Sequence, residues 1–313
     1  MQHTAADPAT CAALSTALDE PLTGTAAVAR GWLCLEQRGP WGRNALVQSH
    51  LDPELGRALE ATAAEHGVRV QLIRHPGRHA DVPGDTSRRV LLANTTPGTG
   101  WLREHTLTDP AELLDLDFAR IAAGHHDGWG QPVAAPVLLI CTNGRRDLCC
   151  ARLGRDLVTD LGGRHDNVIW ETTHTGGHRF APAAVLLPSG YTYGRLTAPA
   201  VEAVLSAAAA GKVALEHCRG RSTWNRAGQA AELAVREHLG EHLADALHIT
   251  GSTSDQVEVA HQDGRSWQVA VRVRELDPPR LNSCGKAAVR PTTTEAVAIS
   301  ATPDQPPRPT RWA

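Results

Sequence analysis

Apolar runs alternate with amphipathic stretches along the second half of the chain, in an order that predicts a mixed α/β domain. Residues 137–141 form a short apolar run after a proline, which is typical of a buried strand. Residues 152–161 carry apolar side chains at helical spacing and stop at two glycines, which predicts a helix. The whole pattern predicts strand, helix, strand, the two strands of a hairpin, and helix, at residues 137–141, 152–161, 167–171, 183–187, 191–196 and 199–210.

The first half of the chain repeats this order. Asp52 and Pro53 supply the cap and the first residue of one predicted helix, and Asp109 and Pro110 begin another. The predicted elements are again strand, helix, strand, hairpin and helix, at residues 29–35, 53–66, 68–73, 89–94, 101–107 and 110–123.

The order of elements is typical of a thioredoxin-like domain, in which the parallel crossover is right-handed. We therefore predict an α/β fold with two tandem thioredoxin-like halves, a degenerate one over residues 10–125 and a second over residues 132–215. The alternative, that the two halves share only the turn and cap residues common to α/β proteins, stays open. Pro182 lies just before the third strand of the second half, where a thioredoxin-like domain usually holds a cis-proline.

Two further regions follow the second half. Residues 220–287 predict an appendage, made of a helix at 227–239 and a hairpin at 256–273 that turns at Asp263-Gly264. From residue 288 onward, proline and threonine are frequent and large apolar residues are few. Residues 288–313 are therefore predicted to form a disordered tail.

Composition limits the classes of partner. The chain has 313 residues, enough for two domains, and carries 31 Lys and Arg against 34 Asp and Glu, so it has no net field to hold nucleic acid or an anionic membrane. No apolar stretch reaches the length of a membrane span, and the N-terminus lacks the pattern of an export signal. Seven cysteines at irregular spacings then argue against a disulfide framework. We expect a cytoplasmic protein, without nucleic-acid or membrane partners, whose thiols serve metal binding or redox chemistry.

Cysteine and histidine residues gather after two neighbouring predicted strands. Cys141 ends the first strand of the second half, and the pair Cys149-Cys150 begins its first helix. His174 and His178 follow the second strand, in a loop with two glycines. The carboxyl ends of parallel strands lie at one edge of a sheet, so these side chains can converge on one site. Adjacent cysteines rarely face the same way, so we expect one of the pair to enter the site and the other to pack on the helix.

The residues alone leave the kind of site open. Two cysteines and two histidines fit tetrahedral zinc, but structural zinc sites usually take cysteines two to four residues apart. The longer step from Cys141 to Cys150 favours a larger metal centre such as an iron-sulfur cluster. A zinc-stabilised binding module is one alternative. A thiol-disulfide oxidoreductase is another, although the chain lacks Cys-x-x-Cys. Cys284 lies outside both halves and is interpreted as a structural or free thiol, with a role as a further long-range ligand left open.

The first half carries a similar but incomplete set of residues. Cys34 lies on its first strand, and His75 and His79 follow its second strand. No second thiol follows Cys34 as Cys149 and Cys150 follow Cys141. We therefore predict that the first half holds no metal.

Three segments together resemble the sucrase/ferredoxin-like proteins. They read CTNGRRDLCC, then THTGGHRFAPAAVLLPSGYTYGRL, then CRGRSTWNRAGQAAELAVRE, and the likeness covers most of residues 10–250. The resemblance implies a thioredoxin-like ferredoxin with a two-iron two-sulfur (2Fe-2S) cluster. Its implied ligands are Cys141, Cys150, His174 and His178, with Cys149 as the reserve ligand. Family loops commonly hold a histidine where this chain has Asn143, so that histidine is not needed as a ligand here.

The resemblance implies an electron carrier rather than an enzyme. The loop holds no pair of carboxylates placed for glycoside hydrolysis, so the word sucrase carries no activity. Neutral imidazoles in place of thiolates predict a reduction potential above that of plant-type ferredoxins. The partners would be a protein donor and a protein acceptor of single electrons. Arg145, Arg146 and Arg179 either help to dock an acidic partner or are simply solvated.

Overall fold

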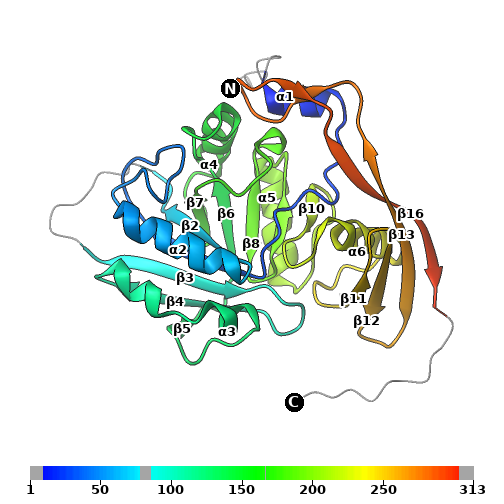
Figure 1. Cartoon of the computed structure of the whole chain (residues 1–313), viewed down its shortest axis with the longest axis horizontal. Coiled ribbons are helices and arrows are strands. Elements are labelled where there is room, and N and C mark those ends of the chain that lie inside the picture. The colour runs from blue at the N-terminus through cyan, green and yellow to red at the C-terminus, as the bar shows by residue number, and fades with distance from the viewer. Residues whose placement is uncertain (1–9, 78–85, 166, 303–313) are drawn as a thin grey trace.

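A ten-stranded mixed sheet forms the centre of the molecule, in a computed structural model that describes residues 10–77, 86–165 and 167–302 (Figure 1). Its strands lie in the order β10-β9-β8-β6-β7-β2-β1-β3-β4-β5. They are β1 (Gly31–Glu36), β2 (Val68–Arg74), β3 (Arg88–Asn94), β4 (Trp101–Leu107), β5 (Gln131–Pro132), β6 (Val137–Cys141), β7 (Ile169–Thr172), β8 (Ala184–Leu187), β9 (Tyr191–Tyr193) and β10 (Cys218–Arg221).

The two halves of the sheet share one pattern of strand pairing. In the first half, β1 pairs in parallel with β2 and antiparallel with β3, and β3 pairs with β4. In the second half, β6 pairs in parallel with β7 and antiparallel with β8, and β8 pairs with β9. The halves meet where β2 and β7 run antiparallel, with Ile73 opposite Thr172 and Arg74 opposite Glu171. The predicted α/β class and the order of elements are confirmed.

Successive side chains of β1 and β6 point to opposite faces of the sheet and pack in different hydrophobic cores. Leu33 and Leu35 of β1 pack in the core of the first half, and Leu138 and Ile140 of β6 pack in that of the second half. The intervening residues of both strands enter a third core that contains side chains from both halves. The two halves therefore share a hydrophobic core. The helices near these cores are α2 (Pro53–Glu65), η1 (Pro110–Asp115), α3 (Phe118–Ala122), η2 (Cys150–Gly154), α4 (Arg155–Leu161), η3 (His178–Phe180) and α5 (Ala198–Ala209).

Two predicted helices differ from the structure. The helix expected at 110–123 is broken into η1 and α3, because the Asp117 side chain accepts a hydrogen bond from the Arg120 N–H and starts a new helix. The helix expected at 152–161 begins as α4 only at Arg155, and the residues before it form η2, a π-helical turn that begins at Cys150. The Ala181-Pro182 peptide bond is cis.

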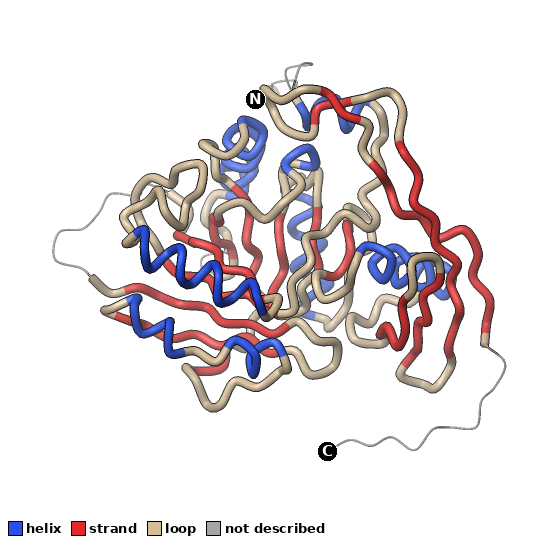
Figure 2. The backbone as a smooth tube through the Cα atoms, in the orientation of Figure 1, coloured by secondary structure: helices blue, strands red, loops and turns tan. Residues whose placement is uncertain are grey.

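A four-stranded antiparallel sheet and a long helix form the C-terminal part of the molecule (Figure 2). The helix agrees with the one predicted at 227–239, and β12 and β13 form the predicted hairpin. The elements are α6 (Arg226–Leu239), β11 (Leu247–Ser252), β12 (Gln256–His261), β13 (Ser266–Glu275) and β16 (Thr292–Ala301).

The prediction of a disordered tail over residues 288–313 is wrong for most of the residues that the structure describes there. β16 pairs with β13 along its whole length, from Thr292 opposite Glu275 to Ala301 opposite Trp267. Threonine is a good strand former, and Ala296 and Ile299 pack against the core beside α6. A segment with few apolar residues can therefore form a strand when it pairs with the edge of an existing sheet. Residues 303–313 lie outside the described part of the chain.

The N-terminal helix and a segment between β13 and β16 lie side by side next to the second half of the large sheet. The N-terminal helix α1 (Cys11–Ala17) lies beside the segment that carries β14 (Arg280–Leu281) and β15 (Ala288–Val289), at the top of Figure 1. We call residues 277–289 the C-terminal strap. Within the described ranges, no helix has both the length and the apolar character needed to cross a bilayer.

Candidate metal centre

Three of the four predicted ligands come together at one edge of the large sheet. Cys141 is the last residue of β6, Cys150 begins η2, and His174 lies in the loop after β7. The two sulfur atoms and one ring nitrogen of His174 all lie within 4.8 Å of one another. This Cys/His group could hold a metal ion.

His178 lies next to this group. Its ring centroid is 4.9 Å from that of His174. Among the described residues, the Nδ1 atoms of His174 and His178 are buried and have no hydrogen-bond partner. Buried polar atoms normally have a partner, so two orphaned nitrogens on neighbouring rings, one of which lies with two thiols, fit residues that hold a metal or cluster.

Close backbone packing positions Cys150 against Cys141. A Cβ atom at Gly154 would overlap the carbonyl oxygen of Cys141, so only glycine allows η2 to approach the end of β6 so closely. The first turn of the helix is thereby held against the strand. This packing places the two thiols side by side.

The loop between the histidines depends on a buried guanidinium group. Gly177 has a positive φ of 72°, and a Cβ there would overlap the Arg219 side chain. Arg219 is 1% exposed, donates to the carbonyl oxygen of Gly176 at 3.0 Å, and also donates to Thr25. The two glycines therefore let the loop wrap around the buried Arg219 guanidinium group.

Cys141 and Cys150 act as a coupled pair. A hydrogen bond from Cys150 and the neighbouring His174 hold the pKa of Cys141 well below its usual range, although burial opposes this. The same hydrogen bond, together with burial, raises the pKa of Cys150 well above its usual value. The hydrogen bond between the two thiols therefore favours negative charge on Cys141 over Cys150.

Buried arginines make the surroundings of the pair positive. The guanidinium groups of Arg69 and Arg219 both interact with the charge on Cys141. Burial is the main influence on both arginines, and it lowers the pKa of Arg219 to about 9. Arg219 therefore remains charged at neutral pH and stabilises negative charge at the site.

Asp147 supports His178 from the side away from the unpaired Nδ1. The His178 Nε2 atom is 3.6 Å from Asp147 Oδ2. Burial lowers the pKa of His178, and the Asp147 charge opposes that effect without reversing it. The imidazole is therefore neutral at pH 7, which is the form that binds metal.

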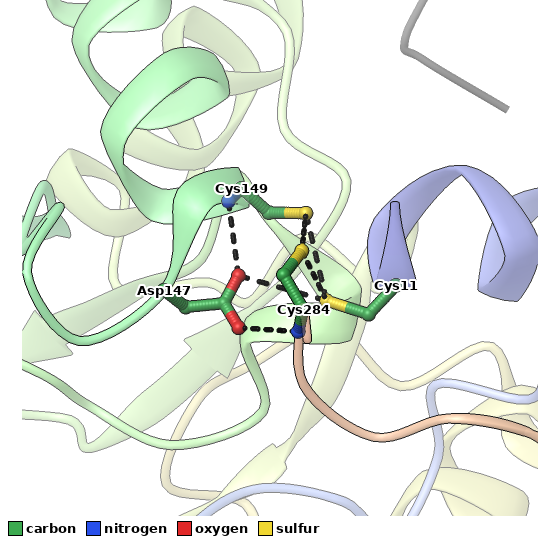
Figure 3. A group of neighbouring side chains, drawn as sticks. All are labelled: Cys11, Asp147, Cys149 and Cys284. Atoms are coloured by element: carbon green, nitrogen blue, oxygen red, sulfur yellow. Dashed lines mark hydrogen bonds between the residues drawn. The ribbon is translucent and has the colours of Figure 1, made fainter. Parts of the chain in front are cut away.

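Cys149, the reserve ligand, belongs to a different group of side chains. Its thiol lies with Cys11, Cys284 and Asp147, and the ligand atoms of these four residues are all within 4.8 Å of one another (Figure 3). The Cys11 thiol and the backbone N–H of Ala12 hold the pKa of Cys149 at about 6, against the effect of burial. Cys284 lies here rather than beside Cys141. No sequence pattern pointed to Cys11, which is 138 residues from Cys149.

The three arginines that could dock an acidic partner, Arg145, Arg146 and Arg179, lie in different environments. Arg179 donates to Glu20, which is 2% exposed, so Arg179 has a structural bond. Arg145 is exposed. His174 and Arg146 line a cavity of about 400 Å³ that also includes Arg43 and Arg69.

The first half differs from the second at the corresponding place. Cys34 is fully buried in the core shared by the halves, and burial raises its pKa. His79 lies outside the described residues. Within the described part of the chain, neither group able to hold a metal includes Cys34 or His75.

Comparison with known proteins agrees with the motifs. The family described as sucrase/ferredoxin-like matches residues 22–220, nearly two thirds of the chain. No curated protein and no solved structure matches this chain. The matched region contains all four predicted ligands, whereas Cys11 and Cys284 lie outside it. The chain belongs to the sucrase/ferredoxin-like family.

Proposed function

We propose that this protein is an electron carrier in which Cys141, Cys150, His174 and His178 hold a 2Fe-2S cluster. The observation that carries the proposal is the pair of buried, unpartnered Nδ1 atoms on the neighbouring rings of His174 and His178, of which His174 lies with the two thiols. When bound, such a cluster supplies a one-electron redox centre.

The chain's own residues supply the charge that such a centre needs. The neighbours of Cys141 favour its thiolate, and Cys150 would have to release its proton to bind. Burial favours the neutral form of His178, whose Nε2 atom lies 3.6 Å from Asp147 Oδ2. Two anionic and two neutral ligands, with Arg69 and Arg219 nearby, favour acceptance of an electron more than four thiolates would.

The charged residues that line the cavity beside His174 favour one class of redox partner. It is lined by Arg43, Arg69 and Arg146 against a single carboxylate, Glu60. A mainly positive rim favours a redox partner with an acidic surface, because complementary charge speeds encounter. Donor and acceptor would use this edge, where His174 is only partly buried.

Ligand exchange tests the proposal. His174→Cys and His178→Cys each replace a neutral ligand by an anionic one, so each variant should keep a coloured cluster with a changed visible spectrum and a lower reduction potential. His238→Cys is the matched control, because His238 is exposed at the end of α6. The measurements are visible absorption and a redox titration of the anaerobically purified full-length chain.

The control should match the unmodified protein in both readouts. If the His174 and His178 variants also keep the spectrum and the potential of the unmodified protein, these histidines are not ligands and the proposal is wrong. Zinc without iron at this site would contradict it equally.

A further inference from the structure

Cys149 forms a second group of thiols with Cys11 and Cys284, separate from the group of Cys141 and Cys150. The Sγ atom of Cys149 is 3.5 Å from that of Cys11 and 3.4 Å from that of Cys284, and the third pair is separated by 3.6 Å. Figure 3 shows the three sulfur atoms pointing toward one another, with the Asp147 carboxylate beside them. Cys11 and Cys149 are 0% and 2% exposed, so the triangle is shielded from water on two sides.

The distances fit the coordination shell of a tetrahedral ion. With zinc–sulfur bonds of about 2.3 Å, two thiolates on one zinc ion are about 3.8 Å apart, and a thiolate and a carboxylate oxygen are about 3.5 Å apart. The sulfur atoms here are slightly closer than that, and Asp147 Oδ1 lies 3.6 Å from Cys11 Sγ. We propose that Cys11, Cys149, Cys284 and Asp147 form a binding site for one zinc ion, separate from the site of Cys141 and Cys150.

Asp147 is held in place for this role. Its Oδ1 accepts from the Cys149 N–H at 2.9 Å, and its Oδ2 accepts from the Cys284 N–H at 2.9 Å and from Ser283 Oγ at 2.8 Å. These hydrogen bonds fix the carboxylate in its charged form beside the three thiols, which is the form that binds a cation. The same carboxylate completes a four-ligand, closed zinc site, and each oxygen can bind a metal and still accept hydrogen bonds.

The ion would join three segments that come from distant parts of the chain. Cys11 lies in α1, Cys284 lies in the C-terminal strap, and Cys149 lies at the start of the helix that carries the first site. A small apolar cluster lies between these segments and consists of Cys11, Ala12, Cys149, Ala181, Leu153, Leu281 and Cys284. Zinc commonly replaces a core that is too small. Because Cys149 adjoins Cys150 and Asp147 adjoins His178, the zinc ion would also fix the edge of the first site.

A disulfide is the chemical rival of a metal at this position. A disulfide would use two of the three thiols and leave the third beside Asp147. Zinc uses all three as thiolates and releases their protons to solvent, without any oxidant. Metal content and thiol counting separate these two states.

Metal content of full-length variants tests the proposal, with iron as an internal control. The unmodified protein, produced with zinc in the medium and purified anaerobically, should contain about one zinc ion per chain. Cys284→Ser should lose the zinc and keep whatever iron the unmodified protein holds. Cys150→Ser should do the reverse, because Cys150 faces the other group. Cys218→Ser, a buried thiol in another core, should leave both metals unchanged.

Cys284 is the best position for the test because it is partly exposed, so serine costs the fold little. Removing zinc from the unmodified protein with a chelator gives a second readout. It should make α1 and the C-terminal strap sensitive to protease, whereas the ten-stranded sheet should stay intact. A protein without zinc, a Cys284→Ser variant with undiminished zinc, or an anaerobic protein with a disulfide among these thiols would overturn the proposal. Iron and zinc are counted separately, so loss of one assignment leaves the other testable.

Discussion

At the scale of single residues, two adjacent cysteines belong to two different groups. Successive side chains on a helix point about 100° apart, so Cys149 and Cys150 cannot face the same site. Cys150 lies with Cys141 and His174, and Cys149 lies with Cys11 and Cys284. The sequence predicted that only one of the pair would enter the site. It could not predict a second group, because Cys11 and Cys284 come from distant segments that no local pattern connects.

Gly177 is the residue whose replacement should affect the first site most selectively. Alanine there must adopt a left-handed conformation, which costs roughly 1–2 kcal/mol, and it must also displace the Arg219 side chain that supports the loop. We expect Gly177→Ala to lower the free energy of unfolding and to reduce bound iron. Urea denaturation and iron analysis of the purified variant measure the two effects.

Gly211→Ala is the matched control for this change. Gly211 has a φ of 67°, and a Cβ atom added there would meet nothing within 4 Å. Alanine at this position therefore has only the free-energy cost of the left-handed backbone conformation. It should keep its full iron content and lose less stability than Gly177→Ala. Equal iron content in the two variants would mean that the glycine loop does not organise the site.

At the scale of elements, the contact between β2 and β7 joins the two halves through a buried ion pair. Arg74 donates to Glu171 Oε2 from Nε at 3.0 Å and from Nη2 at 2.7 Å, and Thr142 Oγ1 donates to the same oxygen at 2.7 Å. Both charged side chains are buried. Thr142 follows Cys141 directly, so this junction also supports the strand end that carries the first thiol.

Breaking this ion pair should be costly. Arg74→Met would leave the Glu171 charge buried without its main partner, so we expect a loss of about 3–5 kcal/mol in the free energy of unfolding, measured with urea. Glu104→Gln is the control, because Glu104 and its partner Arg89 are 40% and 36% exposed. It should cost less than about 1 kcal/mol. A small effect of Arg74→Met would show that water compensates the charge at this junction.

Element order was predictable because strands and helices here carry strong local signals. The apolar run 137–141 and the Asp-Pro starts at 52–53 and 109–110 correspond to observed elements. Two features failed because their causes are not local. β16 is a strand because β13 offers an edge for pairing, and the break at Asp117 reflects a cap that competes with helix continuation.

At the scale of the whole molecule, the two halves form one sheet and share one core, and among the described residues the strand ends bring Cys and His together only in the second half. The sequence predicted the α/β class and the family. The thioredoxin-like description of each half, the division into domains and the cytoplasmic location remain predictions. The contact of α1 and the C-terminal strap with the second half was not predictable, because it depends on contacts between residues about 270 positions apart.

The visible spectrum of the anaerobically purified full-length protein, with iron and sulfide assayed on the same sample, tests the central claim most directly. The proposed function predicts charge-transfer bands that bleach with dithionite, together with about two iron and two sulfide per chain. A colourless protein with neither iron nor sulfide would contradict electron transfer, whatever its zinc content.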